Sequence, residues 1–145
     1  MNITNSSKNN NLPHSVKIIS ASSFFDERGF LSFVENCDLP FEVNRVFWIS
    51  NVPSGQTRGD HAHSICAEIL FPVKGSFDVY TDDGSSKQVF HLDNAAKGLY
   101  IGPYVWCRVE NFSPDSVCVV LCSHPYIKDK YINTYEEFRK TVENS

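Results

Sequence analysis

Short apolar runs separated by turn residues recur along most of this chain. In residues 44–50, Val46 and Trp48 fall on one face of an extended strand, and their odd-numbered neighbours fall on the other. Turn residues recur about every ten positions, a rhythm typical of β-sandwiches and barrels. The pattern therefore predicts an all-β protein, with further strands at residues 16–19, 28–35, 68–73, 76–81, 87–92, 105–111 and 117–122.

Three local signals qualify this pattern. The segment Asp82-Asp83-Gly84 predicts a hairpin turn. Pro72 interrupts an apolar run, which indicates a sheet edge, a bulge or a strand start at that point. Residues 134–137 (Thr-Tyr-Glu-Glu) resemble a capping box, and Phe138 and Val142 lie four positions apart. The end of the chain is thus predicted to form a short helix.

The domain organisation predicted for the 145 residues is simple. Residues 1–12 are rich in Asn and Ser, and we expect them to form a flexible N-terminal segment rather than a signal peptide or a membrane span. The sequence contains neither an internal repeat nor a linker, so residues 13–145 are expected to form a single domain.

Composition and charge narrow the function classes. The formal net charge of −4 argues against a broad surface for nucleic acid, and no apolar run is long enough to span a membrane. The five cysteines include no C-x-x-C pair, and their number is odd. This usage indicates reduced thiols and a cytoplasmic location.

The densest chemistry lies between Gly55 and Gly75. Its spacing is G-x5-H-x-H-x4-E-x6-G, with His61, His63 and Glu68 at the central positions. On a strand, two residues that are two positions apart share a face, with Cα atoms roughly 6.6 Å apart. Two imidazoles directed into one cavity can hold a metal or move protons, and this spacing alone leaves both options open.

The same spacing resembles the first motif of the cupins, which are small jelly-roll β-barrels. Residues 98–111 resemble the second cupin motif, with Gly98, Pro103 and Asn111 in place. Cys107 stands where that motif carries a metal-binding histidine. The resemblance implies a cupin/jelly-roll β-barrel with a short C-terminal helix, and the missing histidine indicates a site without metal.

A narrower resemblance covers residues 28–140. The motifs that carry it are Arg28–Leu31, Arg45–Val46, Arg58–His63, Asp82–Gly84, Gly98–Pro103, Val105–Trp106, Asn111–Ser113 and Tyr131–Lys140. They are similar to those of the sugar-nucleotide 3,4-ketoisomerases that act on dTDP-4-keto-6-deoxyglucose. The resemblance implies an isomerase of deoxysugar or amino-sugar biosynthesis, in a lipopolysaccharide or glycan pathway. It also implies a homodimer that exchanges N-terminal strands and thereby brings Arg28 close to the partner's site.

The residue chemistry suits this reaction. Moving a ketone from C4 to C3 requires protons to leave and reach neighbouring atoms, and His61 and His63 are the candidate catalytic groups. The sequence leaves open which histidine serves carbon. No cofactor is expected, because the reaction is redox-neutral. The candidates for binding the nucleotide are arginines for the pyrophosphate and aromatic rings for the thymine, namely Arg28, Arg45, Arg58, Arg108, Tyr100, Tyr104 and Trp106.

Two alternative functions remain open at this point. One is a metal-dependent cupin enzyme in which His61, His63 and Glu68 are ligands, with Cys107 as a fourth. The other is a cupin that binds a sugar nucleotide without catalysis. Glu68 serves either as a metal ligand or as a group that orients one imidazole.

Overall fold

The structure, a computed structural model, describes residues 8–144. Within that range the chain forms β-strands almost throughout, joined by short turns and two 3₁₀-helices, η1 (Asn36–Asp38) and η2 (Lys128–Lys130). The strands are β1 (Val16–Ser20), β2 (Ser22–Asp26), β3 (Gly29–Phe33), β4 (Arg45–Ser50), β5 (Arg58–His63), β6 (Glu68–Lys74), β7 (Phe77–Asp82), β8 (Lys87–Leu92), β9 (Lys97–Ile101), β10 (Trp106–Glu110), β11 (Val117–Cys122) and β12 (Tyr131–Ile132). One α-helix, α1 (Tyr135–Glu143), follows them.

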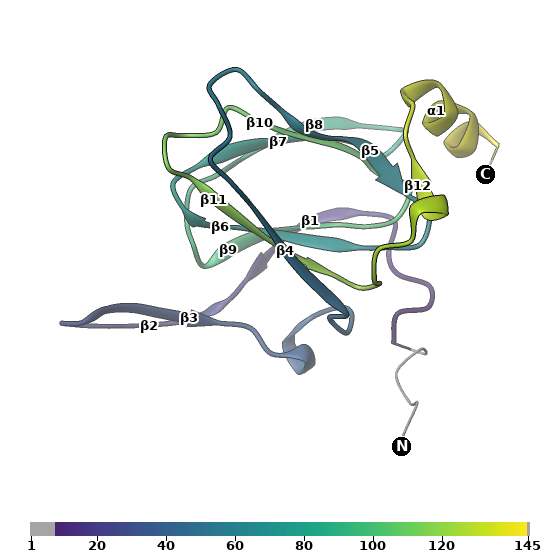
Figure 1. Ribbon diagram of the computed structural model, residues 1–145. Coiled ribbons are helices and arrows are strands. Elements are labelled where there is room, and N and C mark those ends of the chain that lie inside the picture. Colours follow the sequence, from purple (N-terminus) through teal and green to yellow (C-terminus); the bar gives the residue numbers. More distant parts are fainter. Residues whose placement is uncertain (1–7, 145) are drawn as a thin grey trace.

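Two antiparallel sheets of five strands face each other (Figure 1). The strand order is β1-β9-β6-β11-β4 in the first sheet and β12-β5-β10-β7-β8 in the second. The main core fills the space between them and includes Leu70, Phe77, Val79, Leu99 and Val120. This arrangement confirms the predicted all-β jelly-roll barrel with a short C-terminal helix.

Each sheet also buries part of its outer face. The first sheet carries Ile69, Phe71 and Tyr100 outside, where Leu39 and Phe41 of the η1 region cover them. The second sheet carries Ala62 and Trp106 outside, packed against Ile132 and Phe138. Strands that are buried on both faces lose the simple alternation of apolar and polar residues. This loss explains why the sequence pattern missed β9, whose residues Gly98 to Ile101 are all buried.

The sequence pattern also predicted neither strand β2 nor the hairpin that β2 forms with β3. Residues 22–26 pair with residues 29–33 in a separate two-stranded sheet that projects from the body of the molecule (Figure 1). The sequence pattern predicted only its second half, because residues 22–26 contain two serines and end in an aspartate. The alternation predicted for residues 44–50 is confirmed, since Val46 and Trp48 are exposed and Phe47 and Ile49 are half-buried.

Pro72 lies within β6, near the middle of the first sheet. β6 pairs with β9 only over residues 68–70, so the missing N–H of Pro72 leaves no gap in that ladder. On the other side, the register with β11 shifts between Val117 and Cys118. Of the three predicted explanations, the bulge is therefore the one confirmed.

The N-terminal segment differs in part from the expectation. Residues 1–7 of the predicted flexible segment lie outside the described residues. Asn9 is buried, and its amide donates to the carbonyl oxygens of Glu42 at 2.9 Å and Ser123 at 2.6 Å. Because these bonds tie the chain to the body of the molecule, the flexible segment does not extend to residue 12. We propose a single domain that begins at or before Asn9.

The C-terminal helix begins as predicted, and its start is the basis of a stability test. Thr134 is the N-cap, and its hydroxyl accepts a hydrogen bond from the backbone N–H of Glu137 at 3.2 Å. Phe138 is fully buried against Trp106.

Between residues 8 and 144, no helix is long and apolar enough to cross a membrane.

We predict that Thr134→Ala lowers the free energy of unfolding by about 1 kcal/mol, because it leaves an N–H of the first turn without its cap. Thr141→Ala is the matched control. The Thr141 hydroxyl bonds to the carbonyl of Glu137 inside the helix, where alanine has the higher helix propensity. Urea denaturation followed by circular dichroism measures both changes. Equal losses in the two variants would contradict the capping role.

Candidate active site

Strand β5 places both histidines on the inner side of the barrel. Just before them, Gly59 has φ +96° and Asp60 has φ +59°, and the pairing of β5 with β10 is irregular between Cys107 and Arg108. A Cβ at Gly59 would lie 3.0 Å from the carbonyl oxygen of Cys107, so this close approach favours glycine. Beyond the bulge, the His61 and His63 rings lie 4.9 Å apart, edge to face. The predicted common face is confirmed.

His63 is joined to Glu68 across the barrel. His63 ends β5 in the second sheet, whereas Glu68 begins β6 in the first. The Nε2 atom of His63 lies 2.8 Å from Glu68 Oε1, and both side chains are more than nine-tenths buried. The other carboxylate oxygen accepts a hydrogen bond from Cys122 Sγ at 3.7 Å. Glu68 is thus hydrogen-bonded to one imidazole, which is the contact that an orienting role requires.

The surroundings move the pKa values of the two imidazoles in opposite directions. Burial lowers the pKa of His61, and the neighbouring His63 lowers it further. Burial acts in the same way on His63, but the charge of Glu68 and the hydrogen bond to it outweigh burial and raise its pKa. In return, His63 holds the pKa of Glu68 below its usual value although the carboxylate is buried. Unequal neighbours of this kind are typical of acid–base pairs in enzymes.

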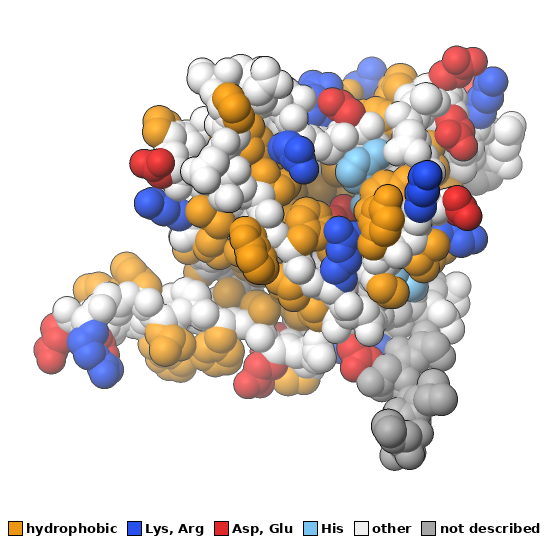
Figure 2. All heavy atoms as spheres, viewed as in Figure 1, with side chains coloured by type: hydrophobic (Ala, Val, Ile, Leu, Met, Phe, Trp, Pro, Cys, Tyr) orange, Lys and Arg blue, Asp and Glu red, His pale blue; other side chains and the backbone are white. Residues whose placement is uncertain are grey.

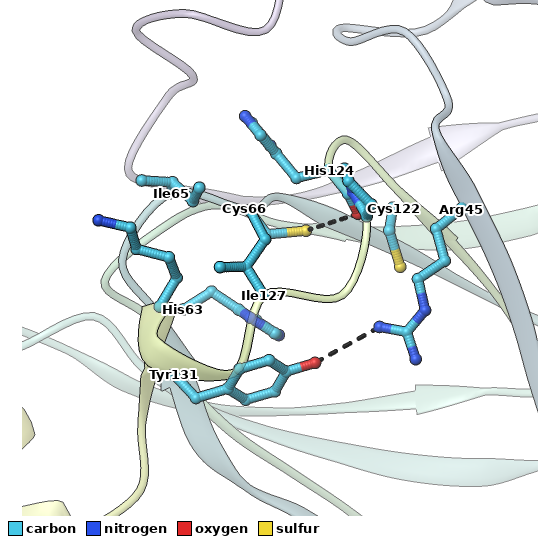
Figure 3. Close-up of a pocket in the computed structure, with 10 residues that line it drawn as sticks. Arg45, His63, Ile65, Cys66, Cys122, His124, Ile127 and Tyr131 are labelled. Atoms are coloured by element: carbon cyan, nitrogen blue, oxygen red, sulfur yellow. Dashed lines mark hydrogen bonds between the residues drawn. The ribbon is translucent and has the colours of Figure 1, made fainter.

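Tyr131 belongs to the same cluster, and the sequence analysis did not identify it as a site residue. β12 sets it directly opposite His63 on β5. Its ring lies 4.4 Å from the His63 ring and 5.1 Å from the His61 ring. Arg45 Nη1 donates to its hydroxyl at 3.4 Å (Figure 3). A strand of two residues gives almost no periodic signal, so only the fold reveals this contact.

Arg45 and Arg58 border the histidines on different sides. The guanidinium of Arg45 lies over the rings of Phe47 and Tyr126, at 4.7 and 5.4 Å from their centroids. Arg58 lines an apolar cavity of about 90 Å³ together with His61 and Glu68. It also lines an open groove of about 530 Å³ outside the barrel. Arg58 thus connects the inner cavity to the surface.

Arg28 lies far from this cluster within its own chain. It occupies the turn of the β2–β3 hairpin, where its side chain is 85% exposed and forms an ion pair with Asp26. Any role of Arg28 at a barrel site therefore requires a second copy of the chain.

Two of the predicted thymine-binding rings are structural instead. Tyr100 is fully buried on the outside of the first sheet, and its hydroxyl donates to the carbonyl of Pro13 at 3.0 Å. Trp106 is 6% exposed and packs against Tyr135 and Phe138 on the outside of the second sheet. Both side chains point away from the barrel interior, so neither can stack on a base there.

Arg108 and Tyr104 also lie outside the histidine cluster. Arg108 directly follows Cys107 on β10, and because Cys107 faces inward, Arg108 faces the opposite side. Its guanidinium forms ion pairs with Glu110 at 2.9 Å and with Asp60 at 3.6 Å. It is therefore an outward-facing residue of an ion-pair network. Tyr104 has φ +59° and lines a separate surface groove that also contains His14 and His124. The structure brings neither side chain to the imidazoles.

Three side chains of this cluster are of the types that bind metal ions. His61, His63 and Glu68 offer three ligand atoms within 4.8 Å of one another. Two ligands of a tetrahedral zinc ion lie about 3.3 Å apart at bond lengths of about 2.05 Å. The His63–Glu68 contact is shorter, at 2.8 Å. Burial raises the pKa of Cys107, so its thiol stays protonated and is a poor fourth ligand. These residues fit a hydrogen-bonded pair better than a metal centre.

Comparison with known proteins adds a family to this geometry. The family described as "FdtA: WxcM-like, C-terminal" matches residues 14–143. A curated protein of Aneurinibacillus thermoaerophilus, TDP-4-oxo-6-deoxy-alpha-D-glucose-3,4-oxoisomerase, is 39% identical over 127 residues. The match spans 87% of this chain and 91% of the relative.

Solved structures agree with this family. QdtA, a sugar 3,4-ketoisomerase from Thermoanaerobacterium thermosaccharolyticum solved with TDP, matches with a TM-score of 0.86 and 30% identity, covering 89% of this chain and 95% of its own. WlaRB, a TDP-quinovose 3,4-ketoisomerase from Campylobacter jejuni, matches with a TM-score of 0.82 and 35% identity, covering 86% and 97%.

We predict that Glu68→Gln lowers the pKa of His63. The substitution removes the charge that favours the imidazolium, so the effect of burial, which disfavours it, is no longer opposed. Titration of the imidazole resonances by NMR measures the change. Asp78→Asn is the matched control, because it removes the carboxylate beside the exposed His91 and should lower only the pKa of His91. An unchanged His63 titration would contradict the control of this imidazole by Glu68.

Proposed function

This chain belongs to the FdtA family, and we propose that it is a sugar-nucleotide 3,4-ketoisomerase. It converts dTDP-4-keto-6-deoxyglucose into a dTDP-3-keto-6-deoxyhexose through an enediol. The observation that carries this proposal is the pair of imidazoles on β5 beside a cavity in the barrel, with the pKa of His61 lowered by burial and that of His63 raised by Glu68 in spite of burial. The two relatives named above from Aneurinibacillus and Thermoanaerobacterium are enzymes of this class.

The reaction needs proton transfers at two carbons and two oxygens. A base removes the proton from C3, and the C–H electron pair forms the double bond between C3 and C4 while O4 gains a proton. The resulting enediol then loses the proton on O3, C3 becomes the carbonyl carbon, and C4 receives a proton. The substrate and product are isomers, so the reaction consumes no oxidant or reductant.

We assign the carbon protons to His61. It lines the cavity, and its lowered pKa keeps it neutral and able to accept a proton near neutral pH. Glu68 raises the pKa of His63 in spite of burial, so His63 is the better placed of the two imidazoles to supply a proton toward oxygen as the enediol forms. Tyr131 packs against both rings, and the hydrogen bond from Arg45 directs its hydroxyl. Tyr131 and Arg45 are thus placed to stabilise the negative charge that develops on oxygen.

The nucleotide is assigned to the outside of the barrel. A cavity of about 90 Å³ cannot enclose a sugar nucleotide, whereas the adjoining groove measures about 530 Å³. Arg58 lines both, and a guanidinium there can bind a pyrophosphate with two hydrogen bonds. The hexose would then enter beside His61 while the diphosphate stays at Arg58.

A homodimer is part of this proposal, because the chain leaves apolar surfaces open. The projecting hairpin exposes large apolar side chains (Figure 2), namely Phe24, Phe25, Phe30, Leu31 and Phe33. β4 is an edge strand, and its outward residues Val46 and Trp48 are 49% and 68% exposed. We propose that each copy lays its hairpin on β4 of the other, which covers both surfaces and carries Arg28 to the partner.

The remaining expectations belong to the same proposal. The enzyme is cytoplasmic, works without metal or cofactor, and serves deoxysugar or amino-sugar synthesis for lipopolysaccharide or another glycan. The odd number of cysteines without a C-x-x-C pair supports the first point, and the hydrogen-bonded His63–Glu68 pair supports the second.

We predict that His61→Asn and His63→Asn each lower kcat about 10²-fold or more, with smaller changes in KM, because they remove proton transfer and leave nucleotide binding in place. Turnover of dTDP-4-keto-6-deoxyglucose in heavy water, followed by NMR, measures the rate and the deuterium expected at C4. His91→Asn is the control, since His91 is exposed and pairs with Asp78 away from the site.

Arg58→Ala serves as a contrast in the same assay, because it should mainly raise KM. Full activity in both histidine variants would overturn the assignment. Tight binding of the nucleotide sugar with no turnover by the unaltered protein would favour the non-catalytic alternative.

We predict that turnover survives exhaustive treatment with a chelator. Metal analysis of the treated protein and a rate measurement before and after treatment test this. Loss of activity that one divalent ion restores would favour the metal-dependent alternative, in which His61, His63 and Glu68 are ligands.

We predict that Phe30→Ser shifts the protein from dimer to monomer at micromolar concentration. Phe30 is 76% exposed in the single chain, and burying such a side chain in a dimer contributes about 1.5–3 kcal/mol. Val89→Ser, at an exposed apolar position on the other sheet, should leave the dimer intact. Light scattering coupled to gel filtration gives the masses, and a monomeric unaltered protein would refute the dimer.

A further inference from the structure

Two cysteines meet beside the His63–Glu68 pair. Cys66 lies in the turn between β5 and β6, and Cys122 ends β11. Both side chains line one small cavity together with Arg45 and Tyr131, and Figure 3 shows both sulfur atoms in that pocket. All five cysteines lie within the described residues, and none is joined in a disulfide in this structure.

The contacts of the pair connect it to the site. Cys66 Sγ lies 3.3 Å from the carbonyl oxygen of Ala67 and accepts a hydrogen bond from Ser123 Oγ at 3.7 Å. Cys122 Sγ donates to Glu68 Oε2 at 3.7 Å. One thiol is thus a direct partner of the carboxylate that orients His63.

The surroundings favour reaction at Cys66 over the other thiols. When Cys66 ionises, the one hydrogen of the Cys122 thiol turns from Glu68 to the Cys66 sulfur. This contact lowers the pKa of Cys66 in spite of burial, and the nearby His63 adds to this effect. Burial raises the pKa of Cys107 and Cys118, and the charge of Asp38 raises that of the exposed Cys37. Thiolates are the reactive form of cysteine, so Cys66 is the one activated thiol of the five.

Access to the pair is restricted by size. Cys66 and Cys122 line a cavity of about 10 Å³, which has room for about one water-sized molecule. Hydrogen peroxide is close to that size, whereas a peptide disulfide is far larger. The cavity therefore favours a small oxidant.

We propose that Cys66 and Cys122 form a redox switch, in which hydrogen peroxide joins them in a disulfide that disconnects Cys122 from Glu68 and slows turnover. The Cys66 thiolate attacks peroxide, the O–O bond breaks, and Cys66 becomes a sulfenic acid as one water leaves. The Cys122 sulfur then attacks Cys66 Sγ, the S–O bond breaks, and a second water leaves. Two thiols lose two electrons, and one peroxide gains them.

The disulfide alters the site because sulfur atoms must approach to about 2.05 Å. Cys122 Sγ then loses its hydrogen and moves away from Glu68, so the carboxylate keeps only His63 of its two side-chain donors. Loss of a partner that orients a ligand or catalytic group typically costs about 10- to 100-fold in activity. This effect on turnover rests on the proposed isomerase function, whereas formation of the bond does not.

The test uses the full chain with Cys37→Ser, which removes the exposed thiol. After treatment with hydrogen peroxide, the intact mass should fall by two hydrogens, and non-reducing peptide mapping should show Cys66 linked to Cys122. In the same sample, kcat should fall at least about tenfold and return after reduction with dithiothreitol.

Two further variants make the test specific. Cys122→Ser keeps a donor for Glu68 and should resist peroxide, whereas Cys118→Ser, buried on the same strand, should stay sensitive. Absence of the cross-link, an unchanged kcat in the cross-linked protein, or equal sensitivity of Cys122→Ser would each overturn the switch. If the reduced protein shows no turnover, the proposed isomerase function is contradicted instead. Mass spectrometry would still detect the cross-link in that case.

Discussion

The site depends on a carboxylate that is buried between two sheets. Removing Glu68 from water costs several kcal/mol unless charge and hydrogen bonds compensate it. His63 supplies that compensation from the opposite sheet, at 2.8 Å, so the two sheets are held at a fixed distance where β5 and β6 meet. The same contact raises the pKa of that imidazole in spite of its burial. His61, two residues away on the same strand, has its pKa lowered by burial and further by His63.

This asymmetry explains why two identical side chains can perform different tasks. An isolated H-x-H on a strand would give two nearly equivalent bases, and neither would be a ready acid at neutral pH. Here one carboxylate distinguishes them, and the Tyr131 ring packs against both without competing for Glu68. The tyrosine hydroxyl is directed to Arg45 instead. Acid and base on β5 and a donor for oxygen on β12 are therefore held around one point.

The sequence predicted those strands that have one face exposed to solvent and one face buried. Strands such as β4 alternate visibly, and the H-x-H spacing fixed the face shared by the histidines. It failed where burial on both faces erases alternation, as in β9. Tyr100 and Trp106 were assigned to a base because they are aromatic. Both instead fill the outer faces of the sheets, where Leu39 and Phe41 after η1 cover Tyr100, and α1 covers Trp106.

Tyr131 and Cys122 show a second limit of sequence reasoning. Both lie more than fifty residues from His61 along the chain, and no local spacing relates them to the motif. Their place is set by strand pairing, Tyr131 with His63 and Cys122 with Glu68. Register therefore decides what surrounds a catalytic pair. Because a thiol and a carboxylate face each other at this position, any chemistry at sulfur is coupled to the charge that distinguishes the two imidazoles.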